Sequence, residues 1–142
     1  MKELIEVQVD IKAPIELVWR CFTEPEHIVN WYYSIDTWHT PQAINDLTAN
    51  GKFKYRMESK DGSMGFDFTG RNIKIDKHEL IRYLLEDGRR VDVKFKTEDG
   101  KVIVSEDFEA QSDHTIHTEK DTWQKTLDNF KFYVENQSKK IS

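Results

Sequence analysis

The sequence predicts an α+β fold in which a curved antiparallel sheet of about six to seven strands is covered by two short helices and a long C-terminal helix. Through most of residues 44 to 109, apolar side chains alternate with polar ones, as in half-buried strands. Residues 119 to 138 instead repeat apolar side chains at helical spacing. An antiparallel sheet needs a cover for its apolar face, and only this last helix is long enough to provide it. Because a curved sheet and one helix leave space between them, we expect a cavity there.

Residues 4 to 11 are predicted to form the first strand, because apolar residues occupy alternate positions. Pro14 ends it, since proline lacks the amide hydrogen of a sheet ladder but fits the first turn of a helix. The following helix has one apolar face, formed by Ile15, Val18, Trp19 and Phe22. A second short helix is expected directly after it, with Thr23 and Glu26 at capping-box spacing. Residues 32 to 43 are expected to form a loop.

Turn dipeptides divide the central region into a meander. Asparagine, aspartate and glycine tolerate the backbone conformations of tight turns, and they occur here as Asn50-Gly51, Asp61-Gly62, Asp87-Gly88 and Asp99-Gly100. Strands are predicted at 52 to 58, 79 to 86, 90 to 97 and 101 to 109, with a further strand through Met64, Phe66 and Phe68 and a short edge strand at 46 to 48. Gly70 interrupts the alternation, which indicates a bulge or a bend.

The long helix is expected to start near Thr118 and Asp121, which can cap it. At about 100° per residue, one narrow stripe contains Trp123, Leu127, Phe130 and Val134, and Phe132 points the opposite way. The stripe is expected to face the inward side chains of the sheet, which are predicted to be Phe53, Tyr55, Met57, Val91, Val93, Phe95, Val102 and Val104.

Composition excludes several classes of protein. The net charge of −5 and the lack of long basic runs argue against nucleic-acid binding. Cys21 is the single cysteine, which is typical of a reducing compartment. No apolar run approaches the ~18 residues needed to span a bilayer, and the N-terminus lacks a signal-peptide core. We therefore expect one cytoplasmic domain, residues 1–142, without membrane association.

The ordered set of segments resembles the START/Bet v-type SRPBCC superfamily and, within it, the family named after the activator of the heat-shock protein 90 ATPase. The segments that carry the resemblance are residues 11–19, 22–26 with Trp31, 38–41, 46–47 with 51–53, Gly70, 105–109 and 123–130. The resemblance covers nearly the whole chain and implies a helix-grip fold with an internal pocket. Two positions depart from the family pattern, because Asn50 and Thr122 stand where glycine is common, and they are expected to affect a turn and the cavity mouth.

The leading functional hypothesis is a binding protein for a small hydrophobic or amphipathic ligand. Ligand sites are mostly apolar and contain a few polar groups. The predicted cavity residues are Trp31, Tyr32, Trp38, Phe53, Tyr55, Met57, Phe66, Phe68, Val93, Phe95, Trp123, Leu127 and Phe130. The competing interpretation of these side chains is ordinary core packing. No catalytic residue, metal site or cofactor is predicted, and His114 and His117 are interpreted as belonging to a solvated loop.

Two alternatives stay open at this point. The family name suggests a protein-interaction domain that activates a chaperone ATPase. The other alternative is a cyclase-type or hydrolase-type enzyme, which would need an inward titratable group, with His39, Asp36 or Tyr55 as the candidates. The sequence does not choose between a monomer and a homodimer.

Overall fold

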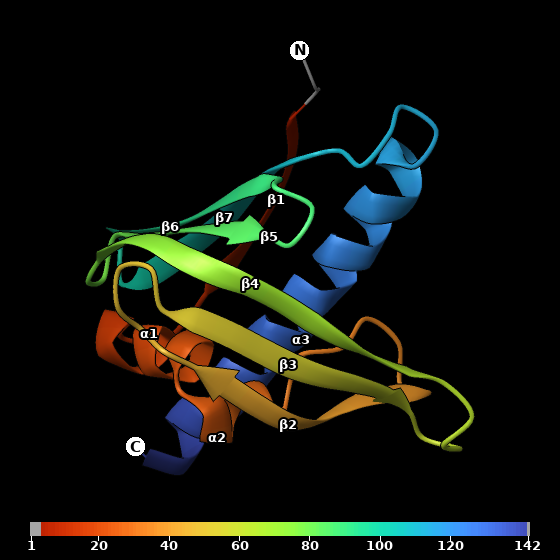
Figure 1. Cartoon of the computed structure of the whole chain (residues 1–142). Helices are drawn as coiled ribbons and strands as arrows, with labels where there is room; N and C mark the ends of the chain where they lie inside the picture. Colours follow the sequence, from red (N-terminus) through yellow and green to blue (C-terminus); the bar gives the residue numbers. More distant parts are fainter. Residues whose placement is uncertain (1–3, 142) are drawn as a thin grey trace.

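Seven antiparallel strands form one curled sheet that wraps along a long helix in the computed structural model, which describes residues 4–141 (Figure 1). The strands are β1 Leu4–Ile11, β2 Trp38–Asn45, β3 Lys52–Ser59, β4 Gly65–Asp76, β5 Leu80–Leu85, β6 Arg90–Glu98 and β7 Lys101–Glu109. The helices are α1 Ile15–Thr23, α2 Pro25–Ile28 and α3 Ile116–Ile141. The predicted fold class is confirmed.

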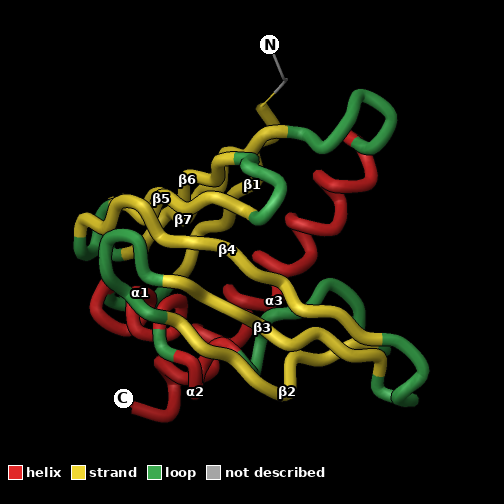
Figure 2. Tube along the Cα trace, viewed as in Figure 1, coloured by secondary structure: helices red, strands yellow, loops and turns green. Residues whose placement is uncertain are grey.

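The strands follow the order β1-β7-β6-β5-β4-β3-β2, so the meander from β2 to β7 is continuous and β1 returns to pair with β7. Figure 2 distinguishes the strands (yellow) from the helices (red) and from the loops that connect them (green). Helices α1 and α2 lie close to the C-terminal end of α3 (Figure 1). The sheet therefore forms a half barrel, and α3 runs across its open side.

The apolar core lies on the concave face of this half barrel. The inward side chains predicted from β3, β6 and β7 are all buried, and so are alternate residues of β1 and β5. From α3, the residues Leu127, Phe130 and Val134 are fully buried, whereas Phe132 is 74% exposed. The predicted helical stripe and the predicted sheet face thus meet, which is the packing that an amphipathic helix and an antiparallel sheet require.

Several boundaries differ from the sequence predictions. The edge strand is β2, at residues 38–45 and not at 46–48, and part of the expected loop is therefore extended. It tolerates Pro41 because the pairing with β3 is irregular between His39 and Gln42, and a proline at an edge-strand bulge loses no ladder bond. The bulge in β4 lies between Asn72 and Lys74. Gly70 serves a different purpose, since a Cβ there would collide with the carbonyl oxygen of Leu84 and the ring of Phe53.

Two predicted helix caps are wrong. Thr23 does not cap α2, because it closes α1 and its hydroxyl donates to the carbonyl oxygen of Trp19 (2.8 Å). Helix α3 begins at Ile116, before the proposed caps Thr118 and Asp121. The preceding Thr115 accepts the first helical bond from the amide of Glu119 (2.8 Å), and its hydroxyl donates to the carboxylate of Glu119 (2.7 Å).

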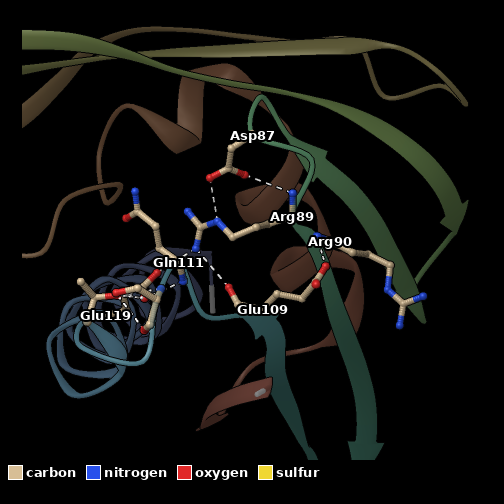
Figure 3. A network of polar contacts seen from close by, with 8 residues as sticks. Asp87, Arg89, Arg90, Glu109, Gln111 and Glu119 are labelled. Atoms are coloured by element: carbon tan, nitrogen blue, oxygen red, sulfur yellow. Dashed lines mark hydrogen bonds and ion pairs between the residues drawn. The ribbon is translucent and has the colours of Figure 1, made fainter. Parts of the chain in front are cut away.

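A buried ion pair anchors the start of α3 to the sheet (Figure 3). Nη1 of Arg89 donates to Oε1 of Glu119 (2.8 Å) and to the carbonyl oxygen of Glu109 (3.1 Å). The second oxygen of Glu119 accepts the amide hydrogen of Gln111 (2.9 Å). Nε of Arg89 also donates to a carboxylate oxygen of Asp87 in the turn before β6 (2.8 Å), and the side chains of Arg89 and Glu119 are both largely buried. The network fixes where the helix leaves the sheet.

Further along, α3 is tied to the N-terminal half of the chain. The side-chain amide of Asn129 donates to the carbonyl oxygen of Tyr33 (2.6 Å), and the carboxylate of Glu135 accepts the amide hydrogen of Lys12 (2.9 Å). These contacts join residues about a hundred positions apart in the sequence. Together with the Arg89 network, these hydrogen bonds fix the position of α3 relative to the sheet.

The Arg89 network is expected to contribute substantially to stability. Arg89→Gln removes the positive charge that pairs with the largely buried Glu119 carboxylate, so the free energy of unfolding should fall by roughly 2–3 kcal/mol. Urea unfolding measures this change. The matched control is Lys125→Gln, which removes the exposed ion pair with Asp121 on the same helix and should change stability by less than about 0.5 kcal/mol. Equal effects of the two substitutions would contradict the anchoring role.

Candidate functional site

A cavity of about 340 Å³ lies between the first half of α3 and the sheet. Helix α3, the segment between α2 and β2, and strands β2, β3, β4 and β7 contribute its lining. The lining residues are Trp31, Tyr32, Tyr33, Ser34, Ile35, Trp38, Met57, Phe66, Phe68, Glu106, Thr122, Trp123, Thr126 and Leu127. Thr122 is exposed and stands at the mouth, whereas Leu127 is buried and lies deeper. The lining is therefore mostly aromatic and aliphatic, with polar side chains at a few positions.

The aromatic walls are held in place by contacts on their far sides. Nε1 of Trp31 donates to the carbonyl oxygen of Cys21 (2.8 Å), and the ring of Trp31 packs on that of Phe130 with centroids 4.5 Å apart. The indole of Trp123 stacks on Phe108 with centroids 4.0 Å apart and an interplanar angle of 19°. Such contacts contribute beyond simple burial and fix the ring orientations. The cavity is therefore a shaped space and not a loosely packed region.

Eight of the thirteen predicted cavity residues line this space, namely Trp31, Tyr32, Trp38, Met57, Phe66, Phe68, Trp123 and Leu127. The other five, Phe53, Tyr55, Val93, Phe95 and Phe130, do not line it and pack into the buried core. These five residues lie at the end of the half barrel that α1 fills. Phe95 and Phe130 both pack against Phe22 of α1, and Phe53 packs against Tyr83, so aromatic rings fill the end near α1 and leave the other end open.

Glu106 is the acidic side chain among the lining residues that the predicted set did not include, the others being Tyr33, Ser34, Ile35, Thr122 and Thr126. It lies on β7 and points to the concave face, between Val7 of β1 and Val93 of β6 in the strand registers. The residue is only 8% exposed. Among residues 4–141, no hydrogen bond or ion pair reaches its carboxyl group. A signal was present, because Glu106 continues the alternation of Val102 and Val104 toward Phe108, and all four share one face of the strand.

Burial raises the pKa of Glu106 to about 8. The physical cause is desolvation, since a carboxylate in an apolar site loses its hydration and gains no compensating partner. Burial also raises the pKa values of the Tyr32, Tyr55 and Tyr83 hydroxyls, and the charge of Glu106 adds to each shift. The cavity thus holds an acid that is mainly neutral at pH 7, with neutral Tyr32 in its lining and neutral Tyr55 and Tyr83 in the adjoining core.

The candidates of the enzyme hypothesis are not brought together. Neither Asp36 nor His39 lines the cavity, and Tyr55 packs into the core. Within residues 4–141, no three side chains of His, Cys, Asp or Glu converge to hold a metal ion. Cys21 is fully buried, and this burial raises the pKa of its thiol to about 12, so it packs as a small apolar residue.

Both expected departures from the family pattern can be located. Asn50 adopts a left-handed backbone with φ of 68°, which asparagine tolerates better than most residues, so the turn before β3 does not need a glycine at position 50. Thr122 lies on the first half of α3 and lines the cavity. Its side chain narrows the mouth at a position where glycine would leave space.

A half barrel of antiparallel strands wrapped around one long C-terminal helix, with a cavity beneath it, defines a helix-grip protein. The chain belongs to the family of activator of Hsp90 ATPase homolog 1-like proteins, whose family model matches residues 12–135. The predicted family is therefore confirmed.

Solved structures agree with this assignment. The AHSA1-like protein from Aeromonas hydrophila is 38% identical to this chain, with a TM-score of 0.86 and 94% of each chain covered. A protein from Cytophaga hutchinsonii is also 38% identical, with a TM-score of 0.80 over 94% of this chain and 92% of that one. A protein from Nitrosomonas europaea shares the fold at 15% identity, with a TM-score of 0.83 over 94% and 95% of the two chains. No curated protein matches the chain at a significant level.

Between residues 4 and 141, no helix is both long enough and apolar enough to cross a membrane. Helix α3 has the length, but its outward face is polar and charged, as its burial pattern and its ion pair between Lys125 and Asp121 indicate. Its apolar stripe is used for packing on the sheet.

The raised pKa of Glu106 makes stability depend on pH in a defined direction. Between about pH 4.5 and pH 8 the unfolded chain releases the Glu106 proton while the folded chain keeps it, so stability falls as pH rises through this window. Glu106→Gln removes this dependence. The stability difference between variant and parent should therefore grow in favour of the variant by about 1.4 kcal/mol per pH unit in this range. Urea unfolding at pH 5, 6, 7 and 8 tests this, and a difference that stays constant with pH would show that Glu106 titrates normally.

Proposed function

We propose that this protein binds one small hydrophobic or amphipathic molecule in the cavity between α3 and the sheet. The single observation that carries this proposal is the cavity itself, with a volume of about 340 Å³ and a lining of fixed aromatic rings. Ligand pockets in proteins are commonly about 300–1,000 Å³, are mostly apolar and contain a few polar groups that orient the ligand. The cavity matches this description in size and in composition.

The cavity is also accessible from one side through an apolar rim. Ile35 and Phe66 line the cavity, and about half of each side chain is exposed. Phe66 packs against Trp38 with ring centroids 5.9 Å apart. Apolar side chains that are gathered at an opening are typical of ligand-binding grooves. An apolar molecule that enters would therefore exchange its contacts with water for contacts with these side chains.

Occupation would also improve packing. Side chains that border an empty space lack dispersion contacts on that side, and these contacts are individually small but large in sum. A ligand of matching shape would restore them along Trp31, Trp123 and Leu127. The affinity would come mainly from buried apolar surface, at roughly 25 cal/mol per Å² before the costs of association.

Filling the cavity by mutation tests the proposal. Thr126→Trp places an indole in the cavity from a helix position that contributes little to the core, so it should lower the affinity for the neutral fluorescent probe N-phenyl-1-naphthylamine by at least about tenfold, which equals ~1.4 kcal/mol. Fluorescence titration measures the affinity. Native mass spectrometry of freshly purified protein would show whether a small molecule is retained.

The matched control is Lys125→Trp, which adds the same indole to the exposed side of α3 and should leave probe binding unchanged. Circular dichroism verifies that both variants are folded. If the folded parent binds no apolar probe, or if both variants bind the probe as the parent does, the cavity is not a ligand site.

A further inference from the structure

Glu106 places an ionisable group without a partner inside an apolar cavity. The residue is 8% exposed, its carboxyl group lines the space under α3, and neither hydrogen bonds nor ion pairs of residues 4–141 satisfy it. Burying a carboxyl group without a partner is unfavourable for folding. The neighbours of Glu106 across the strands are Val7 and Val93, which offer a carboxyl group no polar contact, so packing alone does not account for a glutamate at this position.

No positive group of the described chain faces Glu106 from the elements around it. Strands β1 and β6 place valines beside Glu106. The side chains that line the cavity with Glu106 are uncharged near neutral pH, and they include Tyr32 before β2, Phe68 of β4, and Thr122, Trp123, Thr126 and Leu127 of α3. Tyr55 of β3 and Tyr83 of β5, which interact with Glu106 electrostatically, are also uncharged. Any positive charge that pairs with this carboxylate within the cavity must therefore come from the ligand.

We propose that the ligand is an organic cation, a protonated or quaternary amine on an apolar body, and that its positive charge pairs with the Glu106 carboxylate among the aromatic rings. The proposal rests on the proposed function, because it names the chemical class of the molecule that occupies the same cavity.

The aromatic lining favours a cation over a neutral ligand. The faces of indole and phenol rings attract positive charge, most strongly in desolvated sites, and tryptophan is the best of these rings. Trp31, Trp38 and Trp123 all line the cavity, and Tyr32 lies beside Trp31 with ring centroids 5.3 Å apart. A carboxylate among such rings provides both a counter-charge and a cage. The net charge of −5 also attracts cations toward the protein.

Cation binding through Glu106 has a characteristic pH dependence. The pKa of about 8 means that the empty cavity holds a neutral acid at pH 7, so a cation that pairs with the carboxylate must displace a proton. The affinity for a permanent cation should then rise about tenfold per pH unit up to pH 8 and level off above it. The nearby tyrosine hydroxyls stay neutral throughout, because burial raises their pKa values. A neutral ligand that accepts a hydrogen bond from the protonated acid would show the opposite trend.

The experiment compares benzyltrimethylammonium with its uncharged carbon isostere, neopentylbenzene, as competitors of N-phenyl-1-naphthylamine from pH 6 to pH 9. The two competitors have nearly the same shape and differ in charge. We expect the ammonium compound to bind more tightly as pH rises to 8, and Glu106→Gln to weaken its binding by about tenfold or more at pH 9 while neopentylbenzene changes by less than about threefold. Glu6→Gln, which removes an exposed carboxylate of β1, should leave both affinities unchanged.

The outcomes separate the two proposals. If neopentylbenzene binds in the parent and Thr126→Trp blocks it, but the ammonium compound binds no better at high pH, the cation proposal is overturned and the binding function stands. If Glu6→Gln and Glu106→Gln weaken ammonium binding equally, the effect is due to net charge and the proposal is again overturned. If neither compound nor the fluorescent probe binds, both proposals fail. Because the pH profiles use the unmodified protein, the test does not depend on whether Glu106→Gln folds.

Discussion

The structure depends on the packing of one helical stripe against the concave face of the sheet. Leu127, Phe130 and Val134 of α3 are fully buried there, and polar contacts fix the helix from its first turn, through Arg89 and Glu119, to Glu135 near its end. The helix cannot settle deeper where Trp123 stacks on Phe108. The core is therefore closed at the α1 end and open at the other, and this difference creates the cavity.

The same geometry gives the cavity its chemistry. Strand β7 forms part of the floor, so one of its inward positions lies in the open half, and Glu106 occupies it. In the filled half, a carboxyl group would be costly and would have no access to a partner. In the open half, it remains available to a molecule that enters. In the binding site that we propose, the apolar walls and the carboxyl group of Glu106 would select a ligand by charge as well as by shape.

The period-two patterns and the glycine turns were sufficient to predict the strand order of the meander and its inward face, because each depends on local sequence. Edge strand β2 was missed because Pro41 and the bulge beside it obscure the alternation. The division of the aromatic residues between core and cavity could not be predicted, since it depends on how deeply α1 and α3 enter the half barrel. Glu106 could have been found, because it occupies an inward position of β7 between the apolar residues Val104 and Phe108.

The central claim is that the space under α3 accepts a ligand, and the tryptophans allow a direct measurement of it. Trp31, Trp38 and Trp123 line the cavity, whereas Trp19 is buried against Phe95 and does not line it. In a ¹⁵N-NMR titration with N-phenyl-1-naphthylamine, the indole N–H signals of the three cavity tryptophans should shift in a saturable manner while that of Trp19 stays in place. Saturable binding that leaves the three cavity signals unmoved would contradict the account.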